Sequence, residues 1–269
     1  MQTSTAQDSE SITVQPPSFV ELQADLPVNS GSSCSAVVVF LHGLGDTSEG
    51  IMSIANSMRV DPGLNHVKWI LPQASILAVT GNMKKRMPAW FDIYSFELPV
   101  RVPKPGEEDE AGMLRSIVSI DKLLESVVAS GVDANRIVLG GFSQGAAMTL
   151  LTGLTTAHKL AGLFVLSARL PLRNKFKSMA STHASSVPIF WGHGTRDPLV
   201  SYKLGRACAD FLLTEIGLPK APYPGAPEGL SFHTYQALTH SVRDDELDDL
   251  TSWLKKILPP LEAAQHTSN

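Results

Sequence analysis

The chain has 269 residues, of which 43% are hydrophobic and 18% are charged, a composition that supports a globular fold with a sizeable core. Its 22 Lys and Arg residues against 26 Asp and Glu residues give a net charge of -4, which argues against a nucleic-acid-binding protein. Two cysteines, Cys34 and Cys208, are too few for a disulfide scaffold and too far apart for a zinc motif, so we expect a reducing compartment and no metal.

The two ends of the chain are polar. We predict a leader without regular structure at residues 1–17, one domain at 18–260 and a short tail at 261–269. The leader lacks the basic and apolar regions of a secretory signal peptide, and the longest apolar run, at 36–41, is too short to span a bilayer. These features favour a cytoplasmic protein, with a nuclear pool as an alternative.

From residue 36 onward, short apolar runs alternate with longer segments of helical periodicity. Runs rich in β-branched and aromatic residues predict six strands, at 36–41, 67–71, 137–141, 162–166, 187–191 and 231–235. Because such runs are apolar on both faces, they are typical of a parallel sheet that helices cover on both sides.

Apolar residues spaced three or four apart predict helices between these strands. The predicted helices lie at about 113–128, 145–155, 201–216 and 243–258. The alternation of strand and helix predicts an α/β fold with a mostly parallel central sheet. The stretch at 80–106 has no clean period but contains several large apolar side chains, so we expect either packed structure or a substrate-facing loop there.

The pattern Gly-Phe-Ser-Gln-Gly at 141–145 stands between a predicted strand and a predicted helix. This is the context of a nucleophile elbow, in which a serine on a strained turn needs small residues two positions away on either side. The position therefore predicts Ser143 as a catalytic nucleophile. The alternative is an ordinary structural turn.

A serine nucleophile needs a base and an orienting acid, which in this kind of fold follow in the order serine, acid, histidine. Asp197 follows the predicted strand at 187–191, and His240 follows the one at 231–235. The carboxyl ends of parallel strands meet at one edge of the sheet, so we expect Ser143, Asp197 and His240 to converge there. His193 is the main competitor for the base, but it precedes the candidate acid.

An oxyanion hole requires two N–H donors directed at the attacked carbonyl oxygen. The backbone amides of Gln144, directly after the nucleophile, and Leu44, in the glycine-rich loop after the first long strand, are the candidates. The glycines of that loop do not have the spacing of a dinucleotide-binding fingerprint, and no phosphate-binding loop or zinc-protease motif occurs. We therefore expect no cofactor.

Several motifs together resemble the acyl-protein thioesterases, members of the phospholipase/carboxylesterase group of α/β-hydrolases. The matching stretches are 40–47 (FLHGLGDT), 87–93 (MPAWFDI), 136–145 (RIVLGGFSQG), 159–162 (KLAG) and 197–200 (DPLV). The resemblance implies an α/β-hydrolase fold and hydrolysis of fatty acyl thioesters on S-acylated, for example palmitoylated, proteins. Carboxylesterase or lysophospholipase activity is an alternative within the same chemistry, and a catalytically inactive protein that binds acyl chains or partner proteins is another.

The same resemblance implies the triad Ser143, Asp197 and His240 and the oxyanion donors Leu44 and Gln144. It also implies that four apolar residues flank an acyl channel, with ordinary packing as the alternative; these are Ile76, Leu77, Trp90 and Phe91. Arg169 departs from the family pattern because a charge stands near the expected acyl site, which predicts a shortened or redirected channel. Three cations at 84–86 beside this region are either solvated surface or a transient contact with an anionic membrane.

Overall fold

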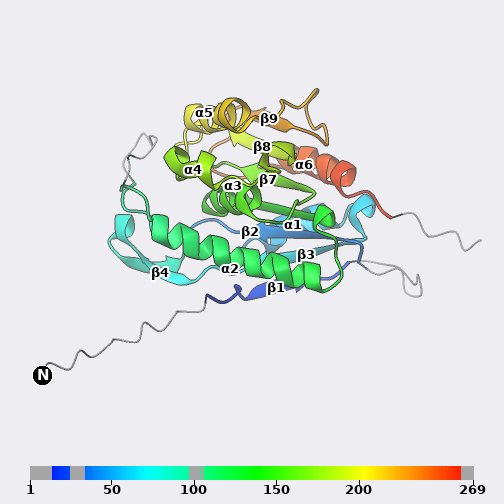
Figure 1. Ribbon diagram of the computed structural model, residues 1–269, viewed down its shortest axis with the longest axis horizontal. Coiled ribbons are helices and arrows are strands. Elements are labelled where there is room, and N and C mark those ends of the chain that lie inside the picture. The colour runs from blue at the N-terminus through cyan, green and yellow to red at the C-terminus, as the bar shows by residue number, and fades with distance from the viewer. Residues whose placement is uncertain (1–13, 25–33, 97–103, 105, 262–269) are drawn as a thin grey trace, which may run out of the picture.

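A seven-stranded sheet forms the middle layer of the computed structural model, which describes residues 14–24, 34–96, 104 and 106–261 (Figure 1). Across the sheet the strands are β1 (Phe19–Leu22), β3 (Val67–Pro72), β2 (Ala36–Leu41), β6 (Ile137–Phe142), β7 (Gly162–Leu166), β8 (Ile189–Gly194) and β9 (Leu230–Tyr235). All neighbouring strands are parallel except β1, which pairs antiparallel with β3. The predicted mostly parallel sheet is confirmed.

All six predicted strands are present, and β8 differs most from its prediction. It begins at Ile189, after Pro188, and continues through Gly192, His193 and Gly194 because these residues pair with β9 as far as Tyr235. A strand ending in Gly-His-Gly has no local β signal, so only the neighbouring strand explains its length. This extension carries β8 toward the loop that contains Asp197.

The structure contains three strands that the sequence pattern did not predict. One is the edge strand β1, and the other two form a separate antiparallel hairpin, β4 (Ile76–Val79) and β5 (Lys85–Pro88). All three have only four residues: β1 and β5 contain charged positions, and β4 is apolar but too short to show a clear period. The stretch at 80–106 contains β5, and its residues 97–103 and 105 lie outside the described part, so the choice between packed structure and a substrate-facing loop stays open.

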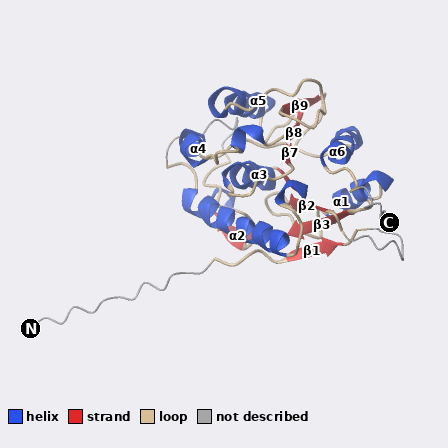
Figure 2. Ribbon diagram, turned by 45° about the vertical axis from the view of Figure 1, so that its right-hand side comes forward, coloured by secondary structure: helices blue, strands red, loops and turns tan. Residues whose placement is uncertain are grey.

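Helices cover both faces of the sheet, as predicted (Figure 2). The α-helices are α1 (Met52–Arg59), α2 (Glu110–Ala129), α3 (Gln144–Thr155), α4 (Arg173–Met179), α5 (Tyr202–Phe211), which continues as a π-helical turn (Leu212–Ile216), and α6 (Asp244–Ile257). Short 3-10 turns lie at Pro62–Leu64, Thr80–Asn82, Ala134–Arg136 and Ala184–Ser186. The four predicted helices are confirmed, whereas α1 and α4 were missed because each is short and buries few residues.

Two apolar cores lie on opposite faces of the sheet. Helices α2, α3, α4 and α5 contribute to the core that contains Val37, Val39 and Leu41, while α1 and α6 contribute to the core around Val38 and Phe40. Successive β2 residues thus point into different cores, which explains why the run is apolar throughout. Because β6, β8 and β9 run parallel in the sheet, their carboxyl ends lie at the same edge.

The domain boundaries at residues 18 and 260 stay a prediction. Residues 1–13 of the predicted leader and 262–269 of the predicted tail lie outside the described residues. Residues 14–17 have no helix or strand, but the carbonyls of Val14 and Gln15 accept hydrogen bonds from Lys122 Nζ and Ser119 Oγ of α2. This segment therefore runs along α2.

Candidate active site

Ser143 occupies the turn between β6 and α3. Its backbone has a φ of 53° and a ψ of -115°, a left-handed conformation that is strained for any residue with a side chain. A Cβ on Gly141 would lie 2.4 Å from the carbonyl carbon of Gly145, and a Cβ on Gly145 would lie 2.3 Å from the carbonyl oxygen of Leu41. Only glycine fits at these two positions, so the GFSQG pattern is explained by backbone contact around the serine.

Ser143, His240 and Asp197 form a continuous chain of hydrogen bonds. The Ser143 Oγ lies 2.8 Å from His240 Nε2, and His240 Nδ1 lies 2.7 Å from Asp197 Oδ2. With the imidazole proton on Nδ1, His240 donates to the carboxylate and accepts the serine hydroxyl proton at Nε2. The residues come from the ends of β6, β8 and β9, as the order serine, acid, histidine predicted.

The Asp197 carboxylate is held by more than the histidine. Its side chain is completely buried, and its Oδ1 accepts hydrogen bonds from the amides of Leu199 at 2.9 Å and Val200 at 2.8 Å. Burial alone would raise the pKa of Asp197, but the hydrogen bonds from His240 and these amides outweigh it and hold the pKa below its ordinary value. The group is therefore a carboxylate at neutral pH and can stabilise a protonated His240.

His193, the competing histidine, packs behind the acid. Its Nε2 lies 2.8 Å from the Val200 carbonyl oxygen and 3.7 Å from Asp197 Oδ2, and its ring is wholly buried against Gly205 of α5. Burial lowers the pKa of His193 and thus favours the neutral ring, which donates from Nε2 to Val200. His193 accordingly supports the acid loop, while His240 alone of the two is hydrogen-bonded to Ser143.

The two candidate oxyanion donors lie on either side of the nucleophile. In the described part of the chain, the amides of Leu44 and Gln144 donate no hydrogen bond to the backbone, so both are available to a ligand. A Cβ on Gly43 would lie 3.6 Å from the Ser143 Cβ, which places the Leu44 loop directly beside the serine. This arrangement can bind the negative oxygen of a tetrahedral intermediate.

His42 gives the loop before Leu44 its shape, a role that the sequence did not indicate. His42 Nδ1 lies 2.7 Å from the Gly43 carbonyl, and its Nε2 accepts a hydrogen bond from the amide of Ala74 at 3.0 Å. Burial lowers the pKa of His42, so the ring is neutral and one nitrogen can accept while the other donates. The amide of Gly45 donates to the Pro88 carbonyl at 2.8 Å and ties the same loop to β5.

The residues expected at an acyl channel differ in their exposure. Trp90 and Phe91 are 4% and 3% exposed and belong to the larger core, Leu77 is half-buried, and Ile76 is 50% exposed on the hairpin. Their role in acyl binding stays a prediction.

Arg169, the residue that departs from the family pattern, forms an ion pair with Glu108. Arg169 Nη1 lies 2.7 Å from Glu108 Oε1, with 18% and 10% of the two side chains exposed. The second oxygen of Glu108 accepts a hydrogen bond from the Leu172 amide at 3.0 Å. Glu108 thus offsets the charge of Arg169, a partnership across 61 residues that no local pattern could have indicated.

The comparison with known proteins agrees with the geometry of the site. The sequence pattern of the family described as phospholipase/carboxylesterase matches residues 27–258. The chain belongs to this family. It is 41% identical to acyl-protein thioesterase 1 of Cryptococcus neoformans var. neoformans over 87% of this chain and 97% of that protein. It is 40% identical to acyl-protein thioesterase 1 of Mycosarcoma maydis over 86% of this chain and 94% of that protein.

Solved structures of the family share the fold. The structure of Arabidopsis thaliana SOBER1 superposes with a TM-score of 0.74 at 31% identity, covering 83% of this chain and 99% of that one. Acyl-protein thioesterase 2 of Zea mays superposes with a TM-score of 0.70 at 25% identity, covering 90% and 99%. The predicted resemblance, the α/β-hydrolase fold and the serine hydrolase class are thereby confirmed.

Proposed function

We propose that this protein is an acyl-protein thioesterase that removes fatty acyl groups from S-acylated proteins through an acyl-enzyme on Ser143. The observation that carries the proposal is the hydrogen-bonded chain from Ser143 through His240 to Asp197, placed beside two available amides. Relatives about 40% identical over most of their length are named acyl-protein thioesterase 1, which supports a thioester substrate. The activity requires no cofactor.

In the first half of the reaction, His240 Nε2 takes the Ser143 proton as Oγ attacks the thioester carbonyl. The carbonyl oxygen becomes negative and accepts hydrogen bonds from the Leu44 and Gln144 amides. When the intermediate collapses, the carbon–sulfur bond breaks and His240 returns the proton to the departing cysteine sulfur. The fatty acyl group is left on Ser143 as an ester.

In the second half, His240 removes a proton from a water molecule that attacks this ester. The second tetrahedral intermediate uses the same two amides, and its collapse returns the proton from His240 to Ser143 Oγ and releases the fatty acid. Asp197 stabilises the imidazolium in both halves because its carboxylate stays ionised and hydrogen-bonded to Nδ1.

The test is hydrolysis of matched acyl thioesters and oxygen esters, with short and long chains, by the purified protein and by Ser143→Ala. Long-chain thioester hydrolysis that the substitution abolishes is the expected result. Activity that survives in Ser143→Ala would contradict the mechanism. Labelling by a fluorophosphonate probe separates an active hydrolase from an inactive acyl-binding protein, because only an activated serine reacts.

A carboxylesterase or lysophospholipase is the second candidate, favoured by the description of the family itself. Oxygen esters and thioesters pass through the same kind of tetrahedral intermediate, so the triad serves both. Activity confined to short oxygen esters would support this candidate. The Arg169–Glu108 ion pair instead favours hydrolysis of long-chain acyl thioesters, because Glu108 offsets the charge that would otherwise face an acyl chain.

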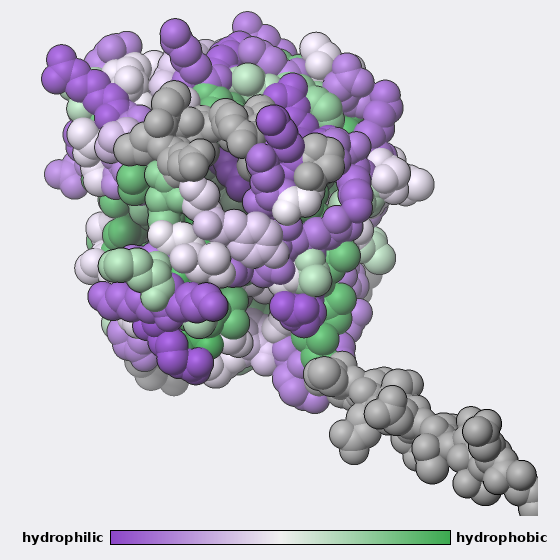
Figure 3. Space-filling view, turned by 90° about the vertical axis from the view of Figure 1, so that its left-hand side faces the viewer, coloured by the Kyte–Doolittle hydropathy of each residue, from purple (hydrophilic) through white to green (hydrophobic). Residues whose placement is uncertain are grey.

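We also propose a cytoplasmic protein that touches membranes transiently through the β4–β5 hairpin. Met83, at the hairpin turn, is 93% exposed, and the cations Lys84, Lys85 and Arg86 beside it are exposed as well. At the end of the molecule where β4 lies, hydrophobic patches alternate with hydrophilic ones (Figure 3). None of the helices in the described residues is long and apolar enough to cross a bilayer.

The membrane proposal predicts that neutralising the three cations weakens binding to anionic vesicles without altering hydrolysis of a water-soluble thioester. Cosedimentation with vesicles of phosphatidylcholine and phosphatidylserine measures the binding, and added salt should mimic the substitution. Equal binding of the wild type and the triple variant would contradict the proposal.

A further inference from the structure

Trp90 is hydrogen-bonded to both sides of the nucleophile at once. Its main-chain N–H donates to the side-chain Oε1 of Gln144 at 2.9 Å, and its indole N–H donates to the carbonyl oxygen of His42 at 2.9 Å. Gln144 carries one candidate oxyanion amide, and His42 lies two residues before Leu44, which carries the other. One residue therefore connects the two chain segments that form the oxyanion hole.

The connection has little freedom to move. The Gln144 side chain also donates from Nε2 to the Phe91 carbonyl at 2.8 Å, so both ends of its carboxamide are bonded to the backbone of residues 90 and 91. The hydroxyl of Ser116 in α2 donates to the Trp90 carbonyl. Trp90 and Gln144 are each 4% exposed, so water does not compete for these bonds.

The indole ring also packs on the segment that it holds. The ring centroids of Trp90 and His42 lie 5.3 Å apart, and the same imidazole bonds to the Gly43 carbonyl immediately before Leu44. A shift of the indole would move the His42 carbonyl and the start of the Leu44 loop together. The separation of the two oxyanion amides thus depends on Trp90, although Trp90 donates nothing to the substrate oxygen.

We propose that Trp90 is a positioning residue that holds the two halves of the oxyanion hole at their working separation. The role rests on the proposed function, in which the Leu44 and Gln144 amides bind the oxyanion. It differs from lining an acyl channel, because it predicts an effect on the transition state and not on the binding of the acyl chain. Donors that are displaced by a fraction of an ångström lose transition-state stabilisation while ground-state binding persists.

The decisive comparison is Trp90→Phe against Trp191→Phe. Both tryptophans are buried in the same core, but the indole N–H of Trp191 has no hydrogen-bond partner in the described part of the chain. Trp191→Phe is therefore a matched control that shrinks a buried ring without breaking such a bond. Thermal unfolding and circular dichroism verify that both variants are folded.

Trp90→Phe should lower kcat about 10- to 100-fold with KM changed less than about threefold, because a displaced oxyanion donor costs part of the roughly 100- to 1000-fold of a deleted one. Inhibition by an alkyl boronic acid, which forms a tetrahedral adduct with the serine, should weaken by a similar factor. Trp191→Phe should change kcat and the affinity for the boronic acid less than about threefold. Equal kcat and equal boronic acid affinity in the two folded variants would overturn the proposal.

Substitutions of the Gln144 side chain test the same connection if Trp90→Phe does not fold, because they leave the backbone amide in place. Gln144→Met removes both side-chain bonds and should lower kcat at every pH. In Gln144→Glu, a protonated carboxyl can still donate to the Phe91 carbonyl, whereas a carboxylate would repel it. The ratio of kcat for Gln144→Glu to wild type should therefore fall as pH rises, while the ratio for Gln144→Met stays flat.

A pH-independent ratio for Gln144→Glu, or a kcat near wild type for Gln144→Met, would overturn the proposal. The proposed function fails separately, if the wild type shows no thioester hydrolysis that depends on Ser143. The two failures are distinguished by assaying the wild type, Ser143→Ala and the positioning variants on the same thioester.

Discussion

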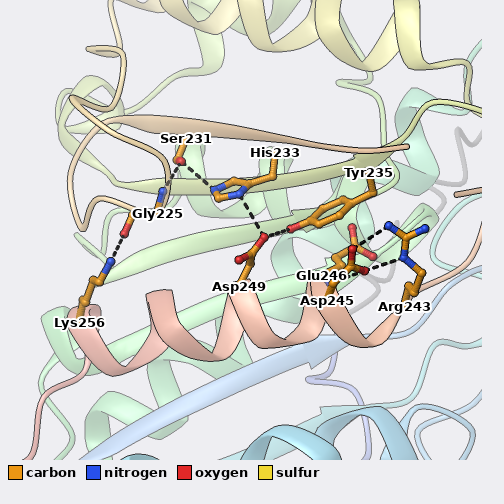
Figure 4. A network of polar contacts seen from close by, with 9 residues as sticks. All are labelled: Gly225, Ser231, His233, Tyr235, Arg243, Asp245, Glu246, Asp249 and Lys256. Carbon is orange, nitrogen blue, oxygen red and sulfur yellow. Dashed lines mark hydrogen bonds and ion pairs between the residues drawn. The ribbon is translucent and has the colours of Figure 1, made fainter. Parts of the chain in front are cut away.

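The described part of the chain contains two serine–histidine–aspartate arrangements, and only one of these two has the surroundings of a catalytic site. Besides the chain from Ser143 to Asp197, Ser231 Oγ lies 2.9 Å from His233 Nε2, and His233 Nδ1 lies 3.7 Å from Asp249 Oδ2 (Figure 4). We refer to these three residues as the second network. It connects β9 with α6 on the other side of β8 from the nucleophile.

The surroundings of the two serines differ. Ser143 stands on a strained turn beside two available amides, whereas Ser231 lies inside β9, is 3% exposed, and accepts a hydrogen bond from the Gly225 amide at 2.8 Å. No substrate carbonyl can reach a hydroxyl enclosed in this way.

The two acids, Asp197 and Asp249, also differ in how far solvent reaches them. The Asp197 side chain is fully buried, while that of Asp249 is 53% exposed, so solvent weakens its effect on the histidine. Burial accordingly dominates and lowers the pKa of His233 despite the nearby carboxylate. The comparison teaches that a serine, a histidine and an aspartate in contact with one another do not make a catalytic triad by themselves. The serine must also be accessible, the acid must be buried and oxyanion donors must be present.

The largest expected contrast is between the two serines. Ser143→Ala should lower kcat by about 10⁶-fold, because it removes the nucleophile, whereas Ser231→Ala should stay within about threefold of the wild type. Thioester hydrolysis and fluorophosphonate labelling of the two variants measure the contrast. Labelling that is lost in Ser231→Ala but kept in Ser143→Ala would reverse the assignment.

The next contrast is between the two acids. Asp197→Asn should lower kcat about 10⁴-fold, since the amide no longer holds His240 in the tautomer that accepts the serine proton. Asp249→Asn should leave kcat within about twofold, because that carboxylate is half exposed and does not contact His240. Steady-state kinetics at neutral pH test both, and near-normal turnover by Asp197→Asn would show that another residue is the acid.

The next prediction concerns the dependence of stability on pH. Beside the second network, Glu246 is completely buried at the start of α6 (Figure 4). Burial raises the pKa of Glu246 from 4.5 to about 8, and the neighbouring Asp245 adds to the rise. A Cβ on Gly192 would lie 2.2 Å from its Oε1, so the carboxyl occupies space that the glycine leaves open. The folded chain thus favours the protonated acid.

Because the folded-state pKa of Glu246 lies above the unfolded value, the folded chain binds more protons between these two values. The free energy of unfolding should therefore fall as pH rises from about 5 to 8, by up to about 1.4 kcal/mol per pH unit from this group. Glu246→Gln should flatten this dependence. Urea unfolding at several pH values measures it, and equal slopes for wild type and variant would show that Glu246 is already ionised in the folded chain.

The smallest expected effect is that of Tyr235→Phe. The Tyr235 hydroxyl donates to Asp249 Oδ2 at 2.9 Å, and its loss should lower the free energy of unfolding by about 0.5–1.5 kcal/mol. Turnover should stay within about twofold because no atom of this pair contacts the triad. Urea unfolding together with kinetics tests the prediction. A large loss of turnover at unchanged stability would give the second network a role in catalysis.

Features with a local signal were predicted correctly from the sequence. The central strands were predicted because each is an apolar run buried on both faces, and Ser143 lies at the strand-to-helix turn that its flanking glycines predict. The hairpin β4–β5 and the helices α1 and α4 were missed, since their few buried residues produce no clear period.

The sequence by itself determined the fold class and the order of the strands along the chain, and it predicted Ser143, Asp197 and His240 as candidates for a triad, because strand ends in a parallel sheet meet at one edge. Only the tertiary structure decided which histidine reaches Ser143, that Glu108 offsets Arg169, and that Trp90 bonds to both His42 and Gln144. These contacts join residues 48 to 97 positions apart. Their partners are chosen by the packing of separate elements, and the periodicity of a single element carries no information about them.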